Sequence, residues 1–311
     1  MNRVRALARR FGMHAVRVSR AGEPILACGD QARPVVVHSI RKSFAGALFG
    51  QILERGLVAL DTTLAELDID DTPTLTAVER SATVQDLLQA RSGVYLPPAV
   101  EPPPGAAHLL PPRPVRGAHP PGTHWCYNNW DFNVLGNIYE RVTHTSVFLG
   151  LDRELARPLG MTDWDPYRHG RYEYRADPLG GTTRYPNYQL AFSARDLDRF
   201  GTLYLRDGRR AGVQVVPAGW AAASTQPVSP TPAEPDHSHH GHLWWVSDGS
   251  GALPRGSFSA LGMGGSFVTV IPGHDLVLVG LFDTHAGGFR PLGAGDRSAL
   301  YRTLIEEATL V

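Results

Sequence analysis

Short runs of alternating apolar and polar residues near both ends of the chain predict β-strands. Residues 14–20 alternate in this way, and a second run at 24–28 follows a Gly-containing turn, so the two predict a hairpin. Toward the other end, residues 266–271 and 275–282 flank a Pro-Gly-His turn and predict a second hairpin. Further strands are expected at 35–37, 242–247 and 257–261.

Between these ends the apolar residues recur at helical spacing. Phe44, Leu48 and Ile52 predict a helix over residues 40–55, with Gly56 as its C-terminal cap. Other helices are expected at 1–11, 83–91 with Thr83 as N-cap, 130–141, 145–155, 193–205, 217–224 and 298–308.

The order of these elements predicts an α+β fold, in which an antiparallel sheet is flanked by helices and joined to a mostly helical second subdomain. We expect residues 1–44 and 190–311 to form the sheet subdomain, with residues 45–189 inserted as the helical one and the functional site between them.

Two stretches show no periodicity. Residues 97–122 are dense in proline and too long for a simple connection, which leaves a mobile segment or a pocket wall as alternatives. Residues 168–186 are also expected to be irregular, and both stretches are candidates for shaping a pocket.

Composition narrows the class of protein. The formal net charge of zero argues against nucleic-acid binding and against a polybasic membrane surface. No apolar run reaches the roughly 18 residues of a spanning helix, and the arginine-rich first residues are typical of an amphipathic helix and not of a secretory signal, so we expect a cytoplasmic protein. The two cysteines, Cys28 and Cys126, are too few for a disulfide framework and are expected to be small buried hydrophobes.

Lys42 is the only lysine of the chain; every other basic residue among the 30 counted as Lys or Arg is an arginine. A buried amine can lose its proton near neutral pH, whereas guanidinium stays charged. Ser39 lies three residues earlier, where a helix places both side chains on one face, and a neutral amine beside a serine activates it as a nucleophile. The alternative is that this four-residue match arises by chance.

Two further stretches are candidates for the same site. Tyr127 lies in a loop just before a helix and could relay a proton, while Asn129 could bind a substrate carbonyl or the lysine; alternatively Tyr127 packs and Asn129 caps the helix. The run from Gly262 to Gly265 lies at a strand edge, where a backbone N–H could complete an oxyanion hole with that of Ser39, or it is simply a glycine bulge.

Together these motifs resemble the penicillin-recognising serine hydrolases, a superfamily with the β-lactamase/transpeptidase-like fold. It includes class C β-lactamases, D-Ala-D-Ala carboxypeptidases, family VIII esterases and 6-aminohexanoate-dimer hydrolases. The resemblance covers nearly the whole chain, and further stretches similar to the family lie at 121–129, 157–161, 193–197 and 243–246.

The resemblance implies an acyl-enzyme mechanism without a cofactor or metal. Ser39 is then the nucleophile, Lys42 its general base and Tyr127 the proton relay, and the oxyanion is held by the N–H groups of Ser39 and Met263. Residues expected to bind substrate are Asn129, Gly262, Gly264, Trp125 and Trp245.

The chain departs from the β-lactamase and carboxypeptidase pattern at Ala260, where those enzymes carry Lys or His. Its Gly-rich run is more similar to the aminohexanoate-dimer hydrolase and esterase branch, which favours a small amide or ester substrate. An acyltransferase, a β-lactamase or D-Ala-D-Ala peptidase, and a non-catalytic binding module stay as alternatives. An α/β-hydrolase is excluded because the chain has no Gly-x-Ser-x-Gly.

Histidines and tryptophans supply weaker candidates. The run 237–242 holds four histidines, but its Pro/Ser-rich setting favours a surface loop over a metal site. His38 is expected to be a packed or surface residue and not a second base. Any of Trp125, Trp130, Trp244 and Trp245 could line an acyl pocket, although large aromatics more often belong to a core.

Overall fold

A computed structural model describes residues 2–101, 112–174, 183–231 and 235–310. Its largest sheet is antiparallel, in the order β2-β1-β13-β12-β11-β10-β9-β8. The strands are β1 (Ala15–Arg20), β2 (Glu23–Gly29), β8 (Ser229–Pro230), β9 (His239–His240), β10 (Trp245–Val246), β11 (Phe258–Leu261), β12 (Phe267–Ile271) and β13 (Leu276–Leu281). Both predicted hairpins are confirmed, since β1 pairs with β2 and β12 pairs with β13.

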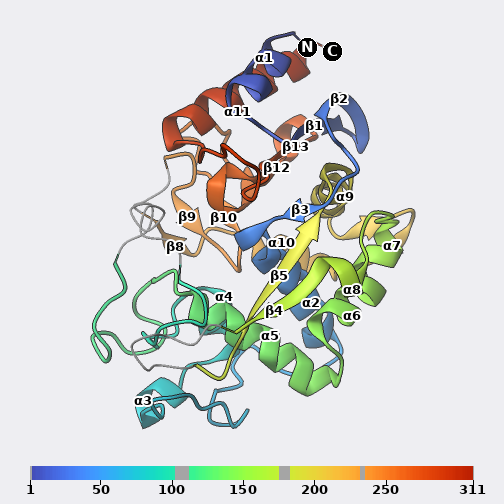
Figure 1. The fold of residues 1–311 in the computed structure, drawn as a ribbon. Coiled ribbons are helices and arrows are strands. Elements are labelled where there is room, and N and C mark those ends of the chain that lie inside the picture. Colours follow the sequence, from blue (N-terminus) through green and yellow to red (C-terminus); the bar gives the residue numbers. More distant parts are fainter. Residues whose placement is uncertain (1, 102–111, 175–182, 232–234, 311) are drawn as a thin grey trace.

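Helices cover both faces of this sheet (Figure 1). On one face lie α1 (Asn2–Arg10) and α11 (Ala294–Thr309), which pack side by side near the two chain ends. On the other lies α9 (Ala194–Leu205). Strand β13 is apolar throughout because its alternate residues face the two layers: Val277 and Val279 join the core around α9, and Leu276 and Leu278 join the core around α1 and α11. The predicted α+β architecture is confirmed.

Helix α2 (Arg41–Glu54) runs through the centre of the molecule, and most of its 14 residues are buried. Phe44 stacks on Phe192 and on Phe200 of α9, at centroid distances of 4.4 and 3.7 Å. Gly50 leaves no room for a side chain, since an added Cβ would lie 2.2 Å from the Trp220 ring, and Trp220 donates its indole N–H to the Gly46 carbonyl at 2.7 Å. The contacts at both ends of the helix therefore fix the position of its first turn.

Other helices follow α2 and fill the middle of the chain. They are α3 (Ala77–Arg80), α4 (Val84–Leu88), α5 (Asn129–Thr143), α6 (Val147–Leu151), α7 (Arg157–Leu159), α8 (Pro166–His169) and α10 (Ala218–Ser224), with single turns at His38–Ile40, Met263–Gly265 and Pro272–His274 and a π-turn at Asp152–Ala156. Thr83 caps α4 as predicted, but the helix ends at Leu88 and not at Arg91, because the next carbonyls accept bonds from other loops. The expected helix over 145–155 is α6 continued by the π-turn.

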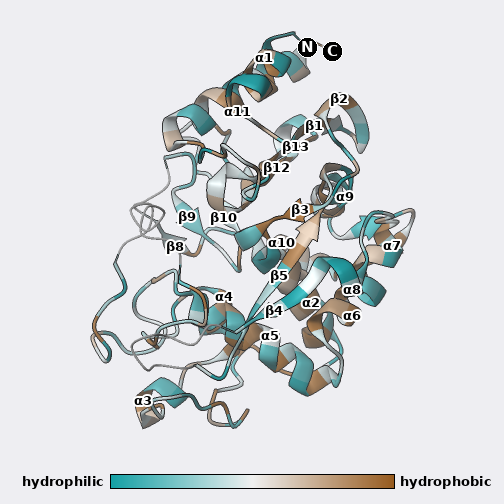
Figure 2. Cartoon of the chain, in the orientation of Figure 1, coloured by the Kyte–Doolittle hydropathy of each residue, from teal (hydrophilic) through white to brown (hydrophobic). Residues whose placement is uncertain are grey.

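A second, three-stranded sheet corrects the prediction of an irregular stretch at 168–186. Its order is β3 (Val35–Val36), β5 (Asn187–Phe192) and β4 (Gly170–Glu173). Figure 2 shows β3 and the adjoining end of β5 as hydrophobic and β4 as largely hydrophilic. Strand β4 lies at the sheet edge with polar residues on it, so it lacks the alternation by which a strand is recognised. Residues 175–182 of the same stretch lie outside the described residues.

The histidine run 237–242 is not the surface loop that was expected. His237, His240 and His242 are buried, and His239–His240 forms strand β9. Hydrogen bonds replace solvent for two of them: His237 Nε2 lies 2.7 Å from Ser259 Oγ, and His242 Nε2 lies 3.0 Å from Gln89 Nε2. The strand expected over 242–247 is shortened to Trp245–Val246, because Leu243 takes a left-handed conformation with φ of 65°.

None of the helices in the part of the chain that the structure describes has the length and hydrophobicity needed to span a bilayer. Cys126 is buried as expected, whereas Cys28 is only half-buried near the sheet edge.

Candidate active site

Ser39 lies on the turn His38–Ile40, between the end of β3 and the start of α2. Lys42 is in the first turn of α2, and its Nζ is hydrogen-bonded to Ser39 Oγ at 2.8 Å and to Tyr127 OH at 2.7 Å. The structure thus brings together the three side chains that the sequence predicted as a catalytic group. The amine sits between two hydroxyl groups, from which it can accept or to which it can donate a proton.

Burial lowers the pKa of Lys42 well below its ordinary value of 10.5, and the neighbouring positive charge of Arg41 lowers it further. Nζ also lies 4.2 and 4.6 Å from the ring centroids of Tyr127 and Phe132, contacts that favour the charged form by about 0.5–2 kcal/mol. Removing an ammonium from water costs several kcal/mol, so the burial effect is the larger one. The surroundings of Lys42 therefore lower its pKa and favour the neutral amine, which has a free lone pair.

Arg41 is held beside Lys42 by neutral groups. Its Nη2 donates to Asn133 Oδ1 at 3.0 Å and to Asn187 Oδ1 at 2.5 Å, and its guanidinium lies 4.1 Å from the Tyr188 ring centroid. A carboxylate in this place would have raised the pKa of Lys42, whereas the two amide oxygens accept from Arg41 Nη2 without cancelling the charge of the guanidinium.

Tyr127 lies just before the N-cap of α5. The alternative prediction that Asn129 caps this helix is wrong. The N-cap of α5 is Asn128, not Asn129; Asn128 Oδ1 accepts from the Trp130 N–H, and its Nδ2 donates to the carbonyls of Val94 and Leu96. These bonds anchor the loop that carries Tyr127. Asn129 is left to face the cavity in front of Ser39.

That cavity has a volume of about 630 Å³. Most of the residues singled out from the sequence line it, namely Ser39, Tyr127, Asn129, Trp245, Gly262, Met263 and Gly264. Lys42 lies beneath Ser39 and Tyr127 and is almost completely buried.

The glycine run places the end of β11 against the turn that holds Ser39. An added Cβ on Gly262 would lie 2.5 Å from the Val37 carbonyl oxygen, so only glycine allows this approach. Within the run, the N–H of Gly262 bonds to the Ser266 carbonyl at 2.7 Å and that of Gly265 bonds to the Gly262 carbonyl at 3.2 Å. Met263, between them, lies on the cavity wall together with Ser39.

Both aperiodic stretches that were expected to shape a pocket contribute to the cavity wall: Val100 and Glu101 come from the proline-rich stretch, and Arg171 and Glu173 come from β4 within 168–186. Asn187 and Gln189 of β5 also line the cavity and were not predicted. The described part of residues 97–122 thus supplies a pocket wall; residues 102–111 lie outside it. A strand edge rich in polar residues was the available signal, but it is indistinguishable from a surface loop in sequence.

His38 lies on the same wall in a left-handed conformation with φ of 49°. Its Nε2 lies 2.8 Å from Thr284 Oγ1, and burial lowers its pKa to about 4. It is packed and neutral near pH 7, in agreement with the expectation from sequence.

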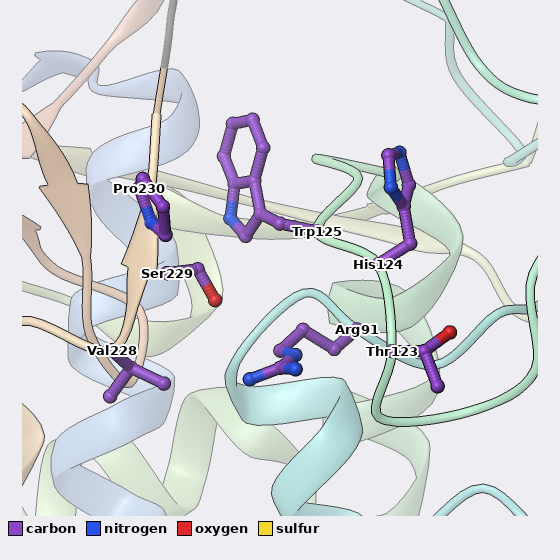
Figure 3. Close-up of a pocket in the computed structure, with 7 residues that line it drawn as sticks. All are labelled: Arg91, Thr123, His124, Trp125, Val228, Ser229 and Pro230. Carbon is purple, nitrogen blue, oxygen red and sulfur yellow. The ribbon is translucent and has the colours of Figure 1, made fainter.

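The predicted tryptophans separate into three groups. Trp245 lines the cavity, whereas Trp130 and Trp244 are completely buried in the core. Trp125 packs on Trp245 and Tyr127, at centroid distances of 6.0 and 6.4 Å, but lines a different, smaller hollow of about 450 Å³ (Figure 3). Trp125 was expected to line the substrate pocket, but it is not among the residues that line the Ser39 cavity.

Metal ligands are not assembled in the described residues, where no three His, Cys, Asp or Glu side chains come close enough to hold an ion. In the 237–242 run, His237 and His242 bond to different partners, Ser259 and Gln89.

The family model described as Beta-lactamase matches residues 15–301. An uncharacterised protein from Alkalihalophilus pseudofirmus is 24% identical over 80% of this chain and 73% of its own length. Solved structures under 25% identical share the fold, and three of them represent different activities.

A Bacillus anthracis protein assigned as a 6-aminohexanoate-dimer hydrolase is 20% identical, with a TM-score of 0.72 over 98% of this chain and 82% of its own. A Mycobacterium bovis β-lactamase is 21% identical, with a TM-score of 0.68 over 98% and 99%. EstCE1, a hydrolase with promiscuous acyltransferase activity, is 16% identical, with a TM-score of 0.67 over 96% and 98%. The expected β-lactamase-like fold is confirmed.

The state of Lys42 can be measured directly because the chain has one lysine. In protein carrying ¹³C-labelled lysine, we expect a single Cε resonance that titrates well below 10.5. Replacing Arg41 with Met removes the adjacent positive charge and should move the titration to higher pH, while Arg55→Gln, on the exposed residue just after α2, should leave it unchanged. A wild-type midpoint near 10.5 would contradict the assignment of a neutral amine.

Proposed function

This chain belongs to the beta-lactamase family, whose members are generally hydrolases, and from that premise we propose that it is a serine hydrolase that cleaves a small amide or ester through an acyl-enzyme on Ser39. The observation that carries the proposal is the position of Lys42 Nζ, within 2.8 Å of Ser39 Oγ and 2.7 Å of Tyr127 OH. A buried amine with a lowered pKa, in contact with a serine hydroxyl at the floor of a cavity, is arranged as a general base.

In the first step, Ser39 Oγ attacks the substrate carbonyl carbon and Lys42 Nζ takes the hydroxyl proton. The new C–O bond forms as the carbonyl π electrons move onto oxygen. Burial matters here, because a base that is neutral before the reaction can accept the proton without first losing one. Arg is unable to do this, since its guanidinium stays protonated.

We assign the resulting oxyanion to the backbone N–H groups of Ser39 and Met263. Both residues line the cavity, and the close packing of Gly262 on Val37 brings the two backbone segments together. Backbone donors held in place by the fold need no reorganisation when the charge develops, which is why such sites lower activation barriers.

Collapse of the tetrahedral intermediate breaks the bond to the leaving amine or alcohol, which must receive a proton. Tyr127 OH is the group placed to give it, because it faces the cavity and can be reprotonated by the ammonium of Lys42. In the second half-reaction Lys42, through Tyr127, takes a proton from water as the water attacks the acyl-enzyme. Collapse of this second tetrahedral intermediate breaks the C–O bond to Ser39 Oγ, which receives the proton back from Lys42. Asn129, at the same wall, is assigned to bind the substrate carbonyl or amide.

Two features support a small amide or ester as the substrate. Ala260 is buried in the core and presents no cation to the cavity at the position where the resemblance implies one for carboxylate-bearing cell-wall substrates. The cavity volume of about 630 Å³ is that of a site for a small molecule. The likeness to an aminohexanoate-dimer hydrolase supports an amide, and the likeness to EstCE1 supports acyl transfer as the second candidate.

A fluorophosphonate should form one covalent adduct on Ser39, detected as a mass increase and located by peptide mapping. Ser39→Ala should abolish the adduct and turnover of p-nitrophenyl esters and amides. Ser43→Ala is the matched control, because the Ser43 hydroxyl donates to the Leu243 carbonyl and has no role in the proposed reaction. Added amines separate the two candidates: amide products indicate transfer, and acid products indicate hydrolysis. Equal loss in both serine variants would place the nucleophile elsewhere.

Replacing Lys42 with Arg should lower kcat/KM by roughly 100- to 10,000-fold, because the variant keeps a long basic side chain but its guanidinium stays protonated and cannot act as a base. Circular dichroism and thermal unfolding would show that the protein is folded. Turnover close to wild type would refute the role of Lys42.

Met263→Pro tests the oxyanion assignment, since it removes one backbone N–H. Gly262 is extended, with ψ of 149°, which suits a residue that precedes proline, and Met263 is the first residue of a helical turn, where proline is tolerated. Proline at position 263 is therefore compatible with the backbone. We expect kcat to fall by about 100- to 1,000-fold in Met263→Pro and to change little in Met263→Ala, which keeps the N–H. Similar kcat values in the two variants would exclude the Met263 donor.

A further inference from the structure

A second hollow, of about 450 Å³, lies on the far side of Trp125 from the candidate active site. Its lining comes from three distant parts of the chain, namely Arg91, the segment 123–125 and the segment 228–230. Figure 3 shows the indole nitrogen of Trp125, the hydroxyl of Ser229 and the guanidinium of Arg91 directed toward the same space. None of these residues takes part in the proposed reaction.

Among the residues that the structure describes, three buried polar atoms of side chains that line this hollow have no hydrogen-bond partner: Trp125 Nε1, Ser229 Oγ and Arg91 Nε. Ser229 is only 3% exposed. A buried polar atom without a partner costs about 1–3 kcal/mol, and three in one place require an explanation. A bound ligand that pairs with all three removes that cost.

The chemistry of the three groups defines the ligand. Indole and guanidinium nitrogens only donate, and a serine hydroxyl can donate, so the ligand must present acceptors. Arg91 also brings a positive charge; its Nη2 donates to the Gly122 carbonyl, and Arg91 has no ion pair within the described residues. The nearby Asp86 is the third residue of α4, where its carboxylate accepts from the N–H and hydroxyl of the N-cap Thr83.

The remaining walls are apolar. Val228, Pro230 and the Trp125 ring surround the space beside the donors. A planar carboxylate matches the fork of a guanidinium, and an attached short hydrocarbon chain matches these walls. We propose that this hollow binds a small carboxylate with a short apolar chain, separately from the Ser39 cavity.

The test uses the indole ¹⁵N–¹H resonance of Trp125, assigned among the six tryptophans by its loss in Trp125→Phe. Hexanoate should shift it in a saturable way, and 1-hexanol, which has the same chain without the charge, should not. The titration is run in wild type and in Ser39→Ala. Because the proposed site does not need Ser39, binding should be equal in both, whether or not the enzyme proposal holds.

Ser229→Ala and Arg91→Gln should each weaken hexanoate binding by about tenfold or more, the usual effect of losing a hydrogen bond to a charged group. Thr123→Val is the matched control, since Thr123 lines the hollow but donates its hydroxyl to the Pro120 carbonyl, and it should bind as wild type does. If Arg91→Gln unfolds because Gly122 loses its partner, Ser229→Ala still decides.

Three results would overturn the proposal. The first is the absence of a saturable shift of the Trp125 resonance. The second is equal binding of hexanol and hexanoate, which would make the hollow an apolar pocket. The third is unchanged affinity in Ser229→Ala, which would place the bound hexanoate elsewhere, such as in the Ser39 cavity, with the shift transmitted through the Trp125–Tyr127 contact.

Discussion

The candidate active site depends on one constraint: the amine of Lys42 must stay away from water and from carboxylates while it contacts the hydroxyl groups of Ser39 and Tyr127. Lys42 satisfies this because it lies in the first turn of a helix that is buried along most of its length. A surface helix could carry the same Ser-x-x-Lys sequence, but solvent would then keep the lysine charged. The central position of α2 is fixed by Phe44 near its start and by Trp220 against Gly46 and Gly50, and the proposed chemistry of Ser39 and Lys42 depends on this position.

The charges around Lys42 follow the same requirement. Its basic neighbour Arg41 is satisfied by two amide oxygens and an aromatic face. On α5, Asp131 is buried and accepts a hydrogen bond from Ser92, and burial raises the pKa of its carboxyl well above its ordinary value. Burial thus shifts the pKa values of both Lys42 and Asp131 toward the neutral form, while Arg41 keeps its charge.

Sequence patterns predicted the parts of the protein that obey local rules. Alternation located β1, β2, β12 and β13, helical spacing located α2, and the single lysine pointed to Ser39 before any fold was known. Long-range packing determined the rest. Strand β4 carries a polar edge that looks like a loop. His240 is buried on β9, which pairs with both β8 and β10. Trp125 faces a hollow that is completed by Arg91 and by residues 228–230, far from it in the sequence. None of these outcomes is encoded within a short window of sequence.

The two sheets divide the Ser39 cavity into walls with different freedom to change. The wall that carries out the proposed chemistry is formed by α2 and the end of β11, where Gly262 admits no side chain. Strand β5 is tied to that wall, since Asn187 holds Arg41. On strand β4, Glu173 accepts a hydrogen bond from Asn187 Nδ2 at 2.8 Å and so belongs to the chain of contacts that holds Arg41. Arg171 does not belong to it: the side chain pairs with Glu173 at the sheet edge and is 62% exposed. In evolutionary terms, Arg171 is the place where this wall can change by a single substitution without disturbing the surroundings of Lys42.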